Sequence, residues 1–282
     1  MHPAKHVLRH DEVHVWTAAL CDGFSAEDAD ILDRDERERA QRFRFERHRR
    51  QFLQSHVMMR RVLAGYTGMA AGALTFRHNR NGKPGLALCR GKRPLHFSLS
   101  HGGDRCMLAV RAEHPIGIDV EQVRDLPDLL AIARRHFVRA ESDALGQLHG
   151  VARRDAFFAL WTRKEAVVKA LGAKLGDCLD RVQFDLEGRL LSLDGDPSHP
   201  DRWTIIRLPD TPGYIAAVAG NPGFRKVVRF DWSPAREWPA QGAARRVSLP
   251  NAAIDEFVAH RCKAPVVRAM RFVSEQAGVE HG

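Results

Sequence analysis

The chain of 282 residues is long enough for one large domain or two of ordinary size, and its 44% hydrophobic and 28% charged residues are typical of soluble globular proteins. Five scattered cysteines without a CxxC pair argue against a disulfide framework or a zinc site. No apolar run approaches the roughly 20 residues of a membrane span, and no signal peptide is evident. We therefore expect a cytoplasmic protein that does not act at a membrane.

A net charge of +9 favours an anionic partner, which could be nucleic acid, a membrane surface, a phosphorylated cofactor or an acidic protein. Ten arginines lie between Arg34 and Arg61. Such a run is most often a solvated helix face. Nucleic-acid binding is the rival interpretation, although no recognisable nucleic-acid-binding module supports it.

The first half begins with residues 13–16, which alternate like a short strand, and Ser25 is a plausible helix start. Residues 52–66 carry a core-facing stripe that predicts a helix ending near Gly68. Residues 81–84, Asn-Gly-Lys-Pro, are typical of a turn between two strands. A lysine in such a turn, here Lys83, is usually only solvated.

Strict alternation over residues 95–101 predicts a strand with His96, Ser98 and Ser100 on one face. Ser100 and His101 are adjacent, but no third member of a catalytic triad can be identified. A strand edge that offers hydroxyls and an imidazole suits phosphate oxygens.

Residues 116–121 form a second informative strand, in which Asp119 and Glu121 share one face with Gly117. Two carboxylates on one face repel each other unless a cation or a basic group lies between them. Exposure of both to water at a sheet edge is the alternative. We expect Gly117 to allow close approach of a bulky ligand.

The organising element is a helix over residues 157–172, in which Trp161, Glu165 and Lys169 lie close to one face and Gly172 ends the helix. On the helix alone, a surface ion pair of Glu165 and Lys169, worth ~0.2–0.5 kcal/mol, is the commoner structure. The alternative is a metal ligand beside a phosphate-binding lysine. Trp161 is interpreted as a packing anchor rather than a catalytic group.

Short strands follow this helix near residues 182–186, 190–193, 203–208 and 214–219. Mixed strands and helices with antiparallel hairpins predict an α+β fold, although no residue-level repeat relates the two halves.

Three stretches taken in order resemble the 4′-phosphopantetheinyl transferases of the surfactin-synthetase-activating type. These are Gly-Lys-Pro at 82–84 with Phe-Ser-Leu-Ser-His at 97–101, Gly-Ile-Asp-Val-Glu at 117–121, and Trp-Thr-Arg-Lys-Glu-Ala-Val-Val-Lys at 161–169. The resemblance covers about residues 10–225. Family members often have Asn where this chain has Ser98 and Ser where it has Gly102, and we expect these differences to alter local hydrogen bonding only.

This resemblance implies two similar α/β halves in a pseudo-twofold arrangement, with a C-terminal extension. The expected boundaries are 1–112, the coenzyme A nucleotide side, 113–225, the metal and catalytic side, and 226–282, a strand and two short helices packing on the body. It also implies transfer of the phosphopantetheine arm of coenzyme A to a serine of an apo acyl or peptidyl carrier protein. Adenosine 3′,5′-bisphosphate would leave. Carrier proteins of this kind are usually acidic, which fits the positive charge.

The resemblance further implies roles for individual residues. Asp119, Glu121 and Glu165 would hold Mg²⁺, with Mn²⁺ as an alternative. Glu165, Lys169 and Asp119 would be catalytic, with Glu165 taking the serine proton directly or through a metal-bound water. The residues expected to bind coenzyme A are Arg60, Lys83, Pro84, Ser100, His101, Lys164 and Lys169. We expect a monomer that does not bind nucleic acid. The alternatives are a nucleic-acid-binding protein and a family member that binds coenzyme A without turnover.

Overall fold

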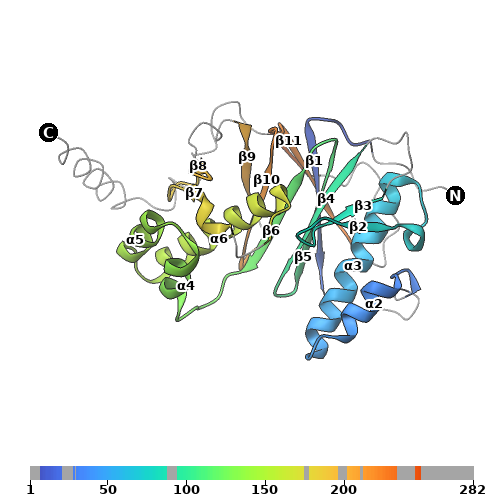
Figure 1. The fold of residues 1–282 in the computed structure, drawn as a ribbon, viewed down its shortest axis with the longest axis horizontal. Helices are drawn as coiled ribbons and strands as arrows, with labels where there is room; N and C mark the ends of the chain where they lie inside the picture. Colours follow the sequence, from blue (N-terminus) through green and yellow to red (C-terminus); the bar gives the residue numbers. More distant parts are fainter. Residues whose placement is uncertain are drawn as a thin grey trace. The chain divides into compact units, whose positions relative to one another are not determined.

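Two main β-sheets, of five and three strands and each packed against one long helix, form the centre of the described part of the chain, and two small two-stranded sheets accompany them (Figure 1). The computed structural model describes residues 7–20, 28, 30–87, 94–174, 178–195, 202–209, 212–233 and 245–248, all within the compact unit Met1–Ser248. The helix start expected at Ser25 and the two helices expected after residue 250 lie outside these residues. None of the described helices has both the length and the hydropathy of a membrane span.

The two halves have the same strand order at the centre of their sheets. In the first half β1 pairs with β5 and β5 with β4, both antiparallel. In the second half β6 pairs with β10 and β10 with β9, again antiparallel. These strands are β1 (Glu12–Ala19), β4 (Leu95–Gly102), β5 (Arg105–Ala112), β6 (Ile116–Gln122), β9 (Thr204–Leu208) and β10 (Tyr214–Gly220). The expected α+β fold of two similar halves is therefore present.

The helices also follow one another in the same order in both halves. A short helix precedes a helix of 22 residues that ends at a left-handed glycine, Gly68 (φ 70°) or Gly172 (φ 67°), and a 3₁₀ turn and a small hairpin follow. The first set is α2 (Arg34–Gln41), α3 (Glu46–Thr67), η1 (Ala71–Ala73), β2 (Phe76–His78) and β3 (Pro84–Leu86); the second is α5 (Arg139–Gln147), α6 (Gly150–Leu171), η2 (Leu179–Arg181), β7 (Val182–Phe184) and β8 (Leu190–Leu193), with α4 (Leu129–His136) before it.

Each long helix buries an apolar face against its own sheet, and this burial holds the half together. Met58, Met59 and Val62 of α3 pack with Trp16 of β1 and Leu108 of β5. Phe157, Leu160 and Val167 of α6 belong to the core of the second half with Ile215 and Ala217 of β10. The helix predicted over 157–172 is thus confirmed and begins seven residues earlier, at Gly150.

A buried cation on each long helix joins that helix to its neighbours. Arg60 of α3 donates through Nε to Glu36 at 2.6 Å and through Nη1 to the carbonyls of Ala71 (3.1 Å) and Leu74 (2.9 Å). Lys164 of α6 lies 2.6 Å from Glu141 and donates to the carbonyls of Leu179 (2.8 Å) and Val182. We call these groups the Arg60 clamp and the Lys164 clamp.

The two clamps occupy equivalent places. Glu36 and Glu141 each lie in the first turn of the short helix, where each accepts a backbone N–H three residues earlier. The carbonyls that Arg60 and Lys164 bind belong to the segment that follows each long helix, within or next to its 3₁₀ turn. Both cations therefore fix a short helix and the following turn to the same helix, and the sequence alone did not reveal this repeat.

Strand β11 (Lys226–Asp231) belongs to the first sheet although it comes last in the chain before β12 (Arg245–Ser248). It pairs parallel with β1, and the Lys226 ammonium lies 2.7 Å from Glu12 Oε1. The predicted strand at 227–230 is confirmed. The expected boundary at 226 separates this strand from the sheet to which it belongs.

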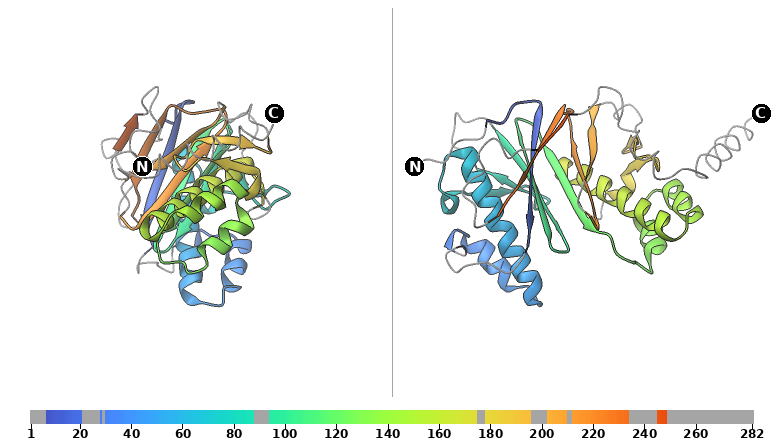
Figure 2. Two further views of the ribbon diagram at one scale, coloured as in Figure 1. Left: turned by 90° about the vertical axis from the view of Figure 1, so that its left-hand side faces the viewer. Right: turned by 180° about the vertical axis from the view of Figure 1, so that it is seen from behind.

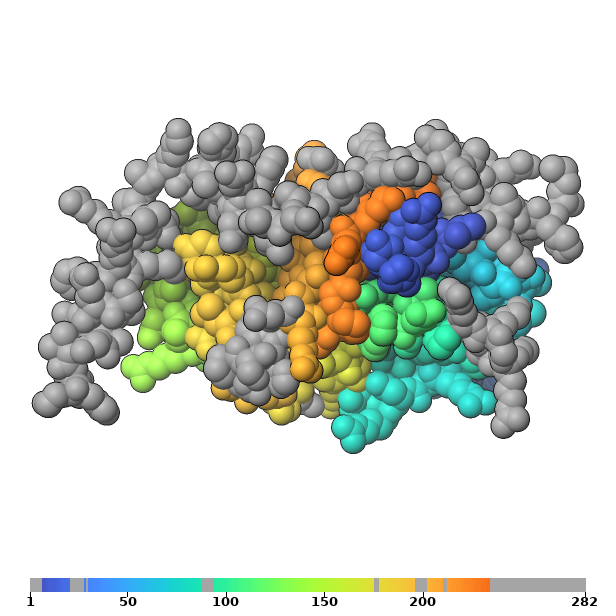
Figure 3. All heavy atoms as spheres, turned by 90° about the horizontal axis from the view of Figure 1, so that it is seen from above, coloured from blue at the N-terminus to red at the C-terminus, as the bar shows by residue number. Residues whose placement is uncertain are grey.

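The halves meet where β4 runs beside β6. The Ser98 hydroxyl accepts the N–H of Ile118 (3.1 Å), and the Ser100 hydroxyl accepts the N–H of Val120 (3.4 Å). A Cβ at Gly102 would lie 2.5 Å from the carbonyl oxygen of Val120, so the two strands approach too closely for a side chain there. Figure 2 shows the two sheets meeting along these strands, and in Figure 3 the orange atoms of β10 and β11 lie between yellow second-half atoms and blue β1.

Candidate functional site

A charged cluster lies between β6 and α6, where the sequence placed it. The Lys169 ammonium is 2.6 Å from Asp119 Oδ1 and 3.9 Å from Glu165 Oε2. Ser100 of β4 donates to the same Asp119 oxygen at 2.8 Å. Asp119 and Glu165 are buried, as the alternation of β6 and the helical period of α6 require. The structure therefore brings together residues from both halves.

Two glutamates beside Asp119 have raised pKa values. Burial, and then the charge of Asp119, raises the pKa of Glu165 to about 7. The same two causes raise the pKa of Glu121 to about 7. Although burial acts in the opposite direction, Asp119 and Glu165 raise the pKa of Lys169. Lys169, together with Arg124 at 3.9 Å from Glu121, is therefore not enough to keep the pKa values of Glu121 and Glu165 in their ordinary range.

This donor set fits a hard divalent cation. Asp119 Oδ2 is buried and accepts no hydrogen bond, so it is an unused carboxylate oxygen next to two carboxylates of raised pKa. Carboxylate oxygens are the ligands that Mg²⁺ and Mn²⁺ prefer. Among the described residues, no three acidic, imidazole or thiol groups are already arranged around a common metal position. A cation here would therefore share its coordination with a bound phosphate or water.

Trp161 supports Glu121 from the helix. Its indole hydrogen-bonds Glu121, and its ring stacks on Phe157 with the centroids 5.8 Å apart. It also packs against Phe137, 6.1 Å away. These contacts fit the packing role expected from the sequence.

Gly117 serves the helix rather than a ligand. A Cβ at this position would lie 1.9 Å from the carbonyl oxygen of Ala166 and 2.5 Å from the amide nitrogen of Ala170. The backbone of α6 therefore fills the space that the sequence analysis assigned to a ligand. The expectation was wrong because the strand pattern shows where a side chain is missing, but not which neighbour approaches.

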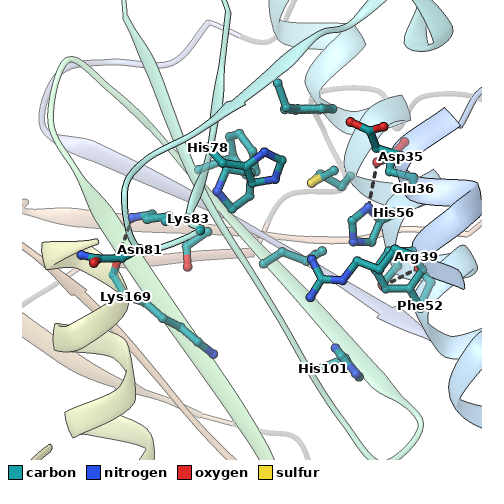
Figure 4. Close-up of a pocket in the computed structure, with 18 of the residues that line it drawn as sticks. Asp35, Glu36, Arg39, Phe52, His56, His78, Asn81, Lys83, His101 and Lys169 are labelled. Carbon is teal, nitrogen blue, oxygen red and sulfur yellow. Dashed lines mark hydrogen bonds and ion pairs between the residues drawn. The ribbon is translucent and has the colours of Figure 1, made fainter. Parts of the chain in front are cut away.

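A pocket of about 690 Å³ opens beside the cluster, between α2 and α3 on one side and the end of α6 and the β2–β3 turn on the other. Figure 4 shows Lys83, Asn81 and Lys169 facing Arg39, Phe52 and His56 across it, with His78 and His101 between them. The pocket reaches the carboxylates through Lys169, which lines it and bonds Asp119. The predicted residues that line the pocket are Lys83, Pro84, His101 and Lys169. Ser100 lies behind it, on Asp119.

The β2–β3 turn closes the pocket by holding the end of α6. Asn79 and Asn81 donate to the carbonyl of Gly172, and Lys83 donates to the carbonyl of Lys169. These carbonyls lie in the last turn and at the C-cap of α6, where backbone partners from the following turn of helix are lacking, although the Lys169 carbonyl also accepts the N–H of Gly172. Burial, and then the charge of Lys169, lowers the pKa of Lys83 to about 8. The predicted turn thus fixes α6 as well as lining the pocket.

Two predicted binding residues, Arg60 and Lys164, lie elsewhere. Both side chains are fully buried, and the Arg60 and Lys164 clamps engage their polar atoms. Neither lines the pocket. We therefore leave them out of the coenzyme A-binding set, because each ammonium or guanidinium group already bonds carboxylates and carbonyls of its own half.

The structure adds pocket residues that the motifs did not indicate. Arg39, Arg42, His56, His78 and Lys174 line it. The only indication in the sequence was the arginine run, and it does not show which of its ten arginines line a pocket. Arg39 lies over the ring of Phe52, 5.4 Å from its centroid, so α2 and α3 must pack before this arginine can be placed.

Comparisons with known proteins agree over both halves. Residues 115–219 match the family model of the 4′-phosphopantetheinyl transferase superfamily, and residues 16–113 match that of the 4′-phosphopantetheinyl transferase N-terminal region. The 4′-phosphopantetheinyl transferase HetI of Nostoc sp. is 32% identical over 82% of this chain and 94% of its own length. The 4′-phosphopantetheinyl transferase Sfp of Bacillus subtilis is 29% identical over 70% of this chain and 81% of its own.

A solved structure, the holo-[acyl-carrier-protein] synthase of Thermotoga maritima, is similar at 23% identity and a TM-score of 0.30. It covers 49% of this chain and 84% of its own.

Proposed function

The chain belongs to the 4′-phosphopantetheinyl transferase superfamily, and from this premise we propose how its residues transfer phosphopantetheine from coenzyme A to a carrier protein. The observation that carries the proposal is the cluster of Asp119, Glu165 and Lys169 at the edge of a cationic pocket. The reaction needs a site that accepts a diphosphate, and this cluster combines an unused carboxylate oxygen with an ammonium.

We assign the pocket to the nucleotide of coenzyme A. Arg39, Arg42, Lys83 and His101 line it and supply donors for phosphate oxygens. Phe52 lies beneath Arg39 and His56 and so supports two of the side chains that line the pocket. The diphosphate would then lie toward Lys169, which neutralises it as a point charge.

Asp119, Glu121 and Glu165 would hold Mg²⁺ or Mn²⁺ together with the phosphate oxygens. When bound, the cation neutralises the diphosphate and the charge that develops on the leaving group. The unused Asp119 Oδ2 and the raised pKa values of Glu121 and Glu165 support this assignment. Ser100 and Lys169 hold Asp119 Oδ1 and thereby leave Oδ2 for the cation.

The chemical step transfers one phosphoryl centre. The carrier serine oxygen forms a bond to the β-phosphorus of coenzyme A, and the bond from that phosphorus to the bridging oxygen breaks, releasing adenosine 3′,5′-bisphosphate. Glu165 takes the serine proton, directly or through a bound water. We place this reaction in the cytoplasm, on acidic acyl or peptidyl carriers.

The test is the intact mass of an apo carrier protein after incubation with the full chain, coenzyme A and Mg²⁺. We expect a gain of one phosphopantetheine arm that is lost in Glu165→Gln and after chelation. Glu38→Gln is the matched control, because Glu38 lies on the exposed side of α2 in an ion pair with Arg34. A panel of carriers without any mass gain would contradict turnover, and retained coenzyme A binding would then indicate a member that binds without transfer.

A further inference from the structure

The connection between α2 and α3 presents a basic and aromatic surface. Residues 41–50, Gln-Arg-Phe-Arg-Phe-Glu-Arg-His-Arg-Arg, are all exposed. They contain five arginines and one glutamate, which gives a charge of +4 on ten residues. We call residues 41–50 the α2–α3 face.

Two phenylalanines of this face stay accessible. Phe45 is 57% exposed and Phe43 36% exposed, although large apolar side chains usually seek the core. Phe45 is the N-cap residue of α3, but its side chain makes no capping hydrogen bond. Its ring contacts Arg44 (5.5 Å to the centroid) and His48 (5.6 Å between centroids), which both belong to the same face. Phe45 therefore makes no cap and leaves more than half of its side chain exposed.

The face adjoins the mouth of the reaction site. Arg42 lines the nucleotide pocket. Gln51, one residue beyond the face, donates to the carbonyl of Gly103 at 2.6 Å.

Gly103 lies close to the strand that carries Asp119 and Glu121. A Cβ at the neighbouring Gly102 would lie 3.1 Å from the Cα of Glu121, so the β4–β5 turn touches the strand of the proposed metal ligands. The face thus lies on one side of that turn and Glu121 on the other. A partner seated on it reaches both the pocket and the carboxylates.

We propose that the α2–α3 face is the docking surface for the carrier protein, which binds through an acidic surface to the arginines and through an apolar side chain to Phe45. The inference rests on the proposed function, which supplies a second, protein substrate that must place its serine at Glu165. Exposed aromatics surrounded by arginine are typical of protein interfaces. Because these arginines are solvated, they act mainly on the rate of encounter.

Nucleic acid could also take an arginine-rich surface with aromatic residues. The position of the face favours the carrier, because Gln51 and Gly103 connect it to the strand that bears Glu121. Binding of RNA instead of carrier is therefore a separate outcome of the test.

The experiment compares Arg44→Glu/Arg47→Glu with the wild-type chain. The described residues give Arg44 and Arg47 no salt bridge, and Arg47 lies in the first turn of α3, where a glutamate is compatible with the helix dipole. The matched control is Arg135→Glu/Arg207→Glu on α4 and β9 of the second half. It reverses the same number of exposed charges, and the described residues give neither of these arginines a salt bridge.

We expect kcat/KM for an acidic apo acyl carrier protein to fall on the order of tenfold to a hundredfold at low salt in the face variant. The difference from wild type should shrink near 1 M salt, where the Debye length is about 3 Å. The dissociation constant of coenzyme A and the behaviour of the control should stay unchanged. Phe45→Ala should raise the carrier KM at both salt concentrations.

Three outcomes would overturn the proposal: equal carrier kinetics in the face variant and wild type, an equal loss in the control, or a loss of RNA binding without a change toward carrier. Each of these leaves wild-type transfer intact, so the proposed function would survive. Failure of the proposed function looks different, because wild type would then give no Glu165-dependent mass gain with any carrier, and the docking proposal would fall with it.

Discussion

The interfaces of β1 with α3 and of β6 with α6 have the same architecture but bury different polar side chains. Where β1 meets α3, the Tyr66 hydroxyl accepts the indole N–H of Trp16 at 2.9 Å and lies 2.6 Å from His14 Nδ1. Where β6 meets α6, Asp119 and Glu165 surround Lys169 instead. The buried carboxylates of Glu12 and Glu36 in the first half each have a cation of their own, Lys226 and Arg60. In the second half Asp119 and Glu165 share Lys169, so this acidic cluster is not a requirement of the common architecture. Its burial disfavours the charged forms and points to chemistry.

The largest expected effect concerns the Arg60 clamp and the Lys164 clamp, the feature that the two halves share. Arg60→Met and Lys164→Met should each lower the free energy of unfolding by about 3–5 kcal/mol, because each leaves a buried glutamate without its cation. Urea unfolding followed by circular dichroism measures this loss. The coenzyme A KM of the folded fraction should not change. A raised KM with unchanged stability would return these residues to the binding set.

The next effect tests where the halves differ. Asp119→Asn should lower kcat by about 10²–10³-fold, the cost of losing one preorganised electrostatic group. Its thermal midpoint should fall less than that of Lys164→Met, because Lys169 keeps Glu165 as a partner and one of the mutually repelling carboxylates is gone. The first-half counterpart, Trp16→Phe, removes the hydrogen bond to Tyr66 and should cost about 1 kcal/mol of stability with kcat unchanged. Equal loss of kcat in both variants would contradict the comparison.

A smaller effect tests the contact of β4 with β6, where the two halves meet. Gly102→Ser should destabilise the protein by about 1–3 kcal/mol, because its Cβ would lie 2.5 Å from the carbonyl oxygen of Val120. Gly146→Ser on α5 is the control, since a Cβ there meets nothing within 4 Å. Thermal unfolding of the two variants separates overcrowding from a general cost of replacing glycine. If Gly102→Ser were as stable as the control, β4 and β6 would have to lie farther apart at Gly102 than the structure shows.

The smallest effect distinguishes the two clamps by pH. Burial alone would raise the pKa of Glu36, but the hydrogen bond and charge of His56, with Asp33 and Arg60, lower it. Burial raises the pKa of Glu141 despite Lys164. The stability that Glu36 contributes is therefore complete above its unfolded pKa of 4.5 and is lost as the pH falls through the folded value. For Glu141 it is complete below 4.5 and is lost as the pH rises through the folded value.

Urea unfolding of Glu36→Gln and Glu141→Gln between about pH 3 and pH 7 measures this difference. Relative to wild type, the deficit of Glu36→Gln should shrink toward low pH, and that of Glu141→Gln should shrink toward high pH. Each pKa unit corresponds to about 1.4 kcal/mol. Parallel pH profiles would show that the two glutamates respond alike.

The sequence predicted the second-half site better than the first-half pocket, for a physical reason. Asp119, Glu165 and Lys169 are set by the period of one strand and one helix, and their contact follows once these pack. Arg39 and His56 meet Lys83 only through the packing of α2, α3 and a distant turn, which no local pattern encodes. The same limit applies to Lys164, whose partner Glu141 lies on another helix.

The order of strands and helices predicted the fold class, but it could not predict the pairing of β11 in the first sheet. A pattern at 227–230 predicted a strand but not its partner. Parallel pairing with β1 joins positions more than 200 residues apart, as Glu12 and Lys226 show. Local periodicity contains no information on such a pairing, and this is why the boundary at 226 separated β11 from its sheet.

That pairing has a consequence for synthesis on the ribosome. The chain emerges from its N-terminus. Strand β1 therefore cannot pair with β11, one of its two neighbours, until Lys226–Asp231 has left the exit tunnel. During that interval β1 is an open edge, with backbone groups ready to pair with another nascent chain. Residues 1–112 made alone would keep this edge permanently. The two halves, alike in architecture, are therefore expected to depend unequally on completion of the chain.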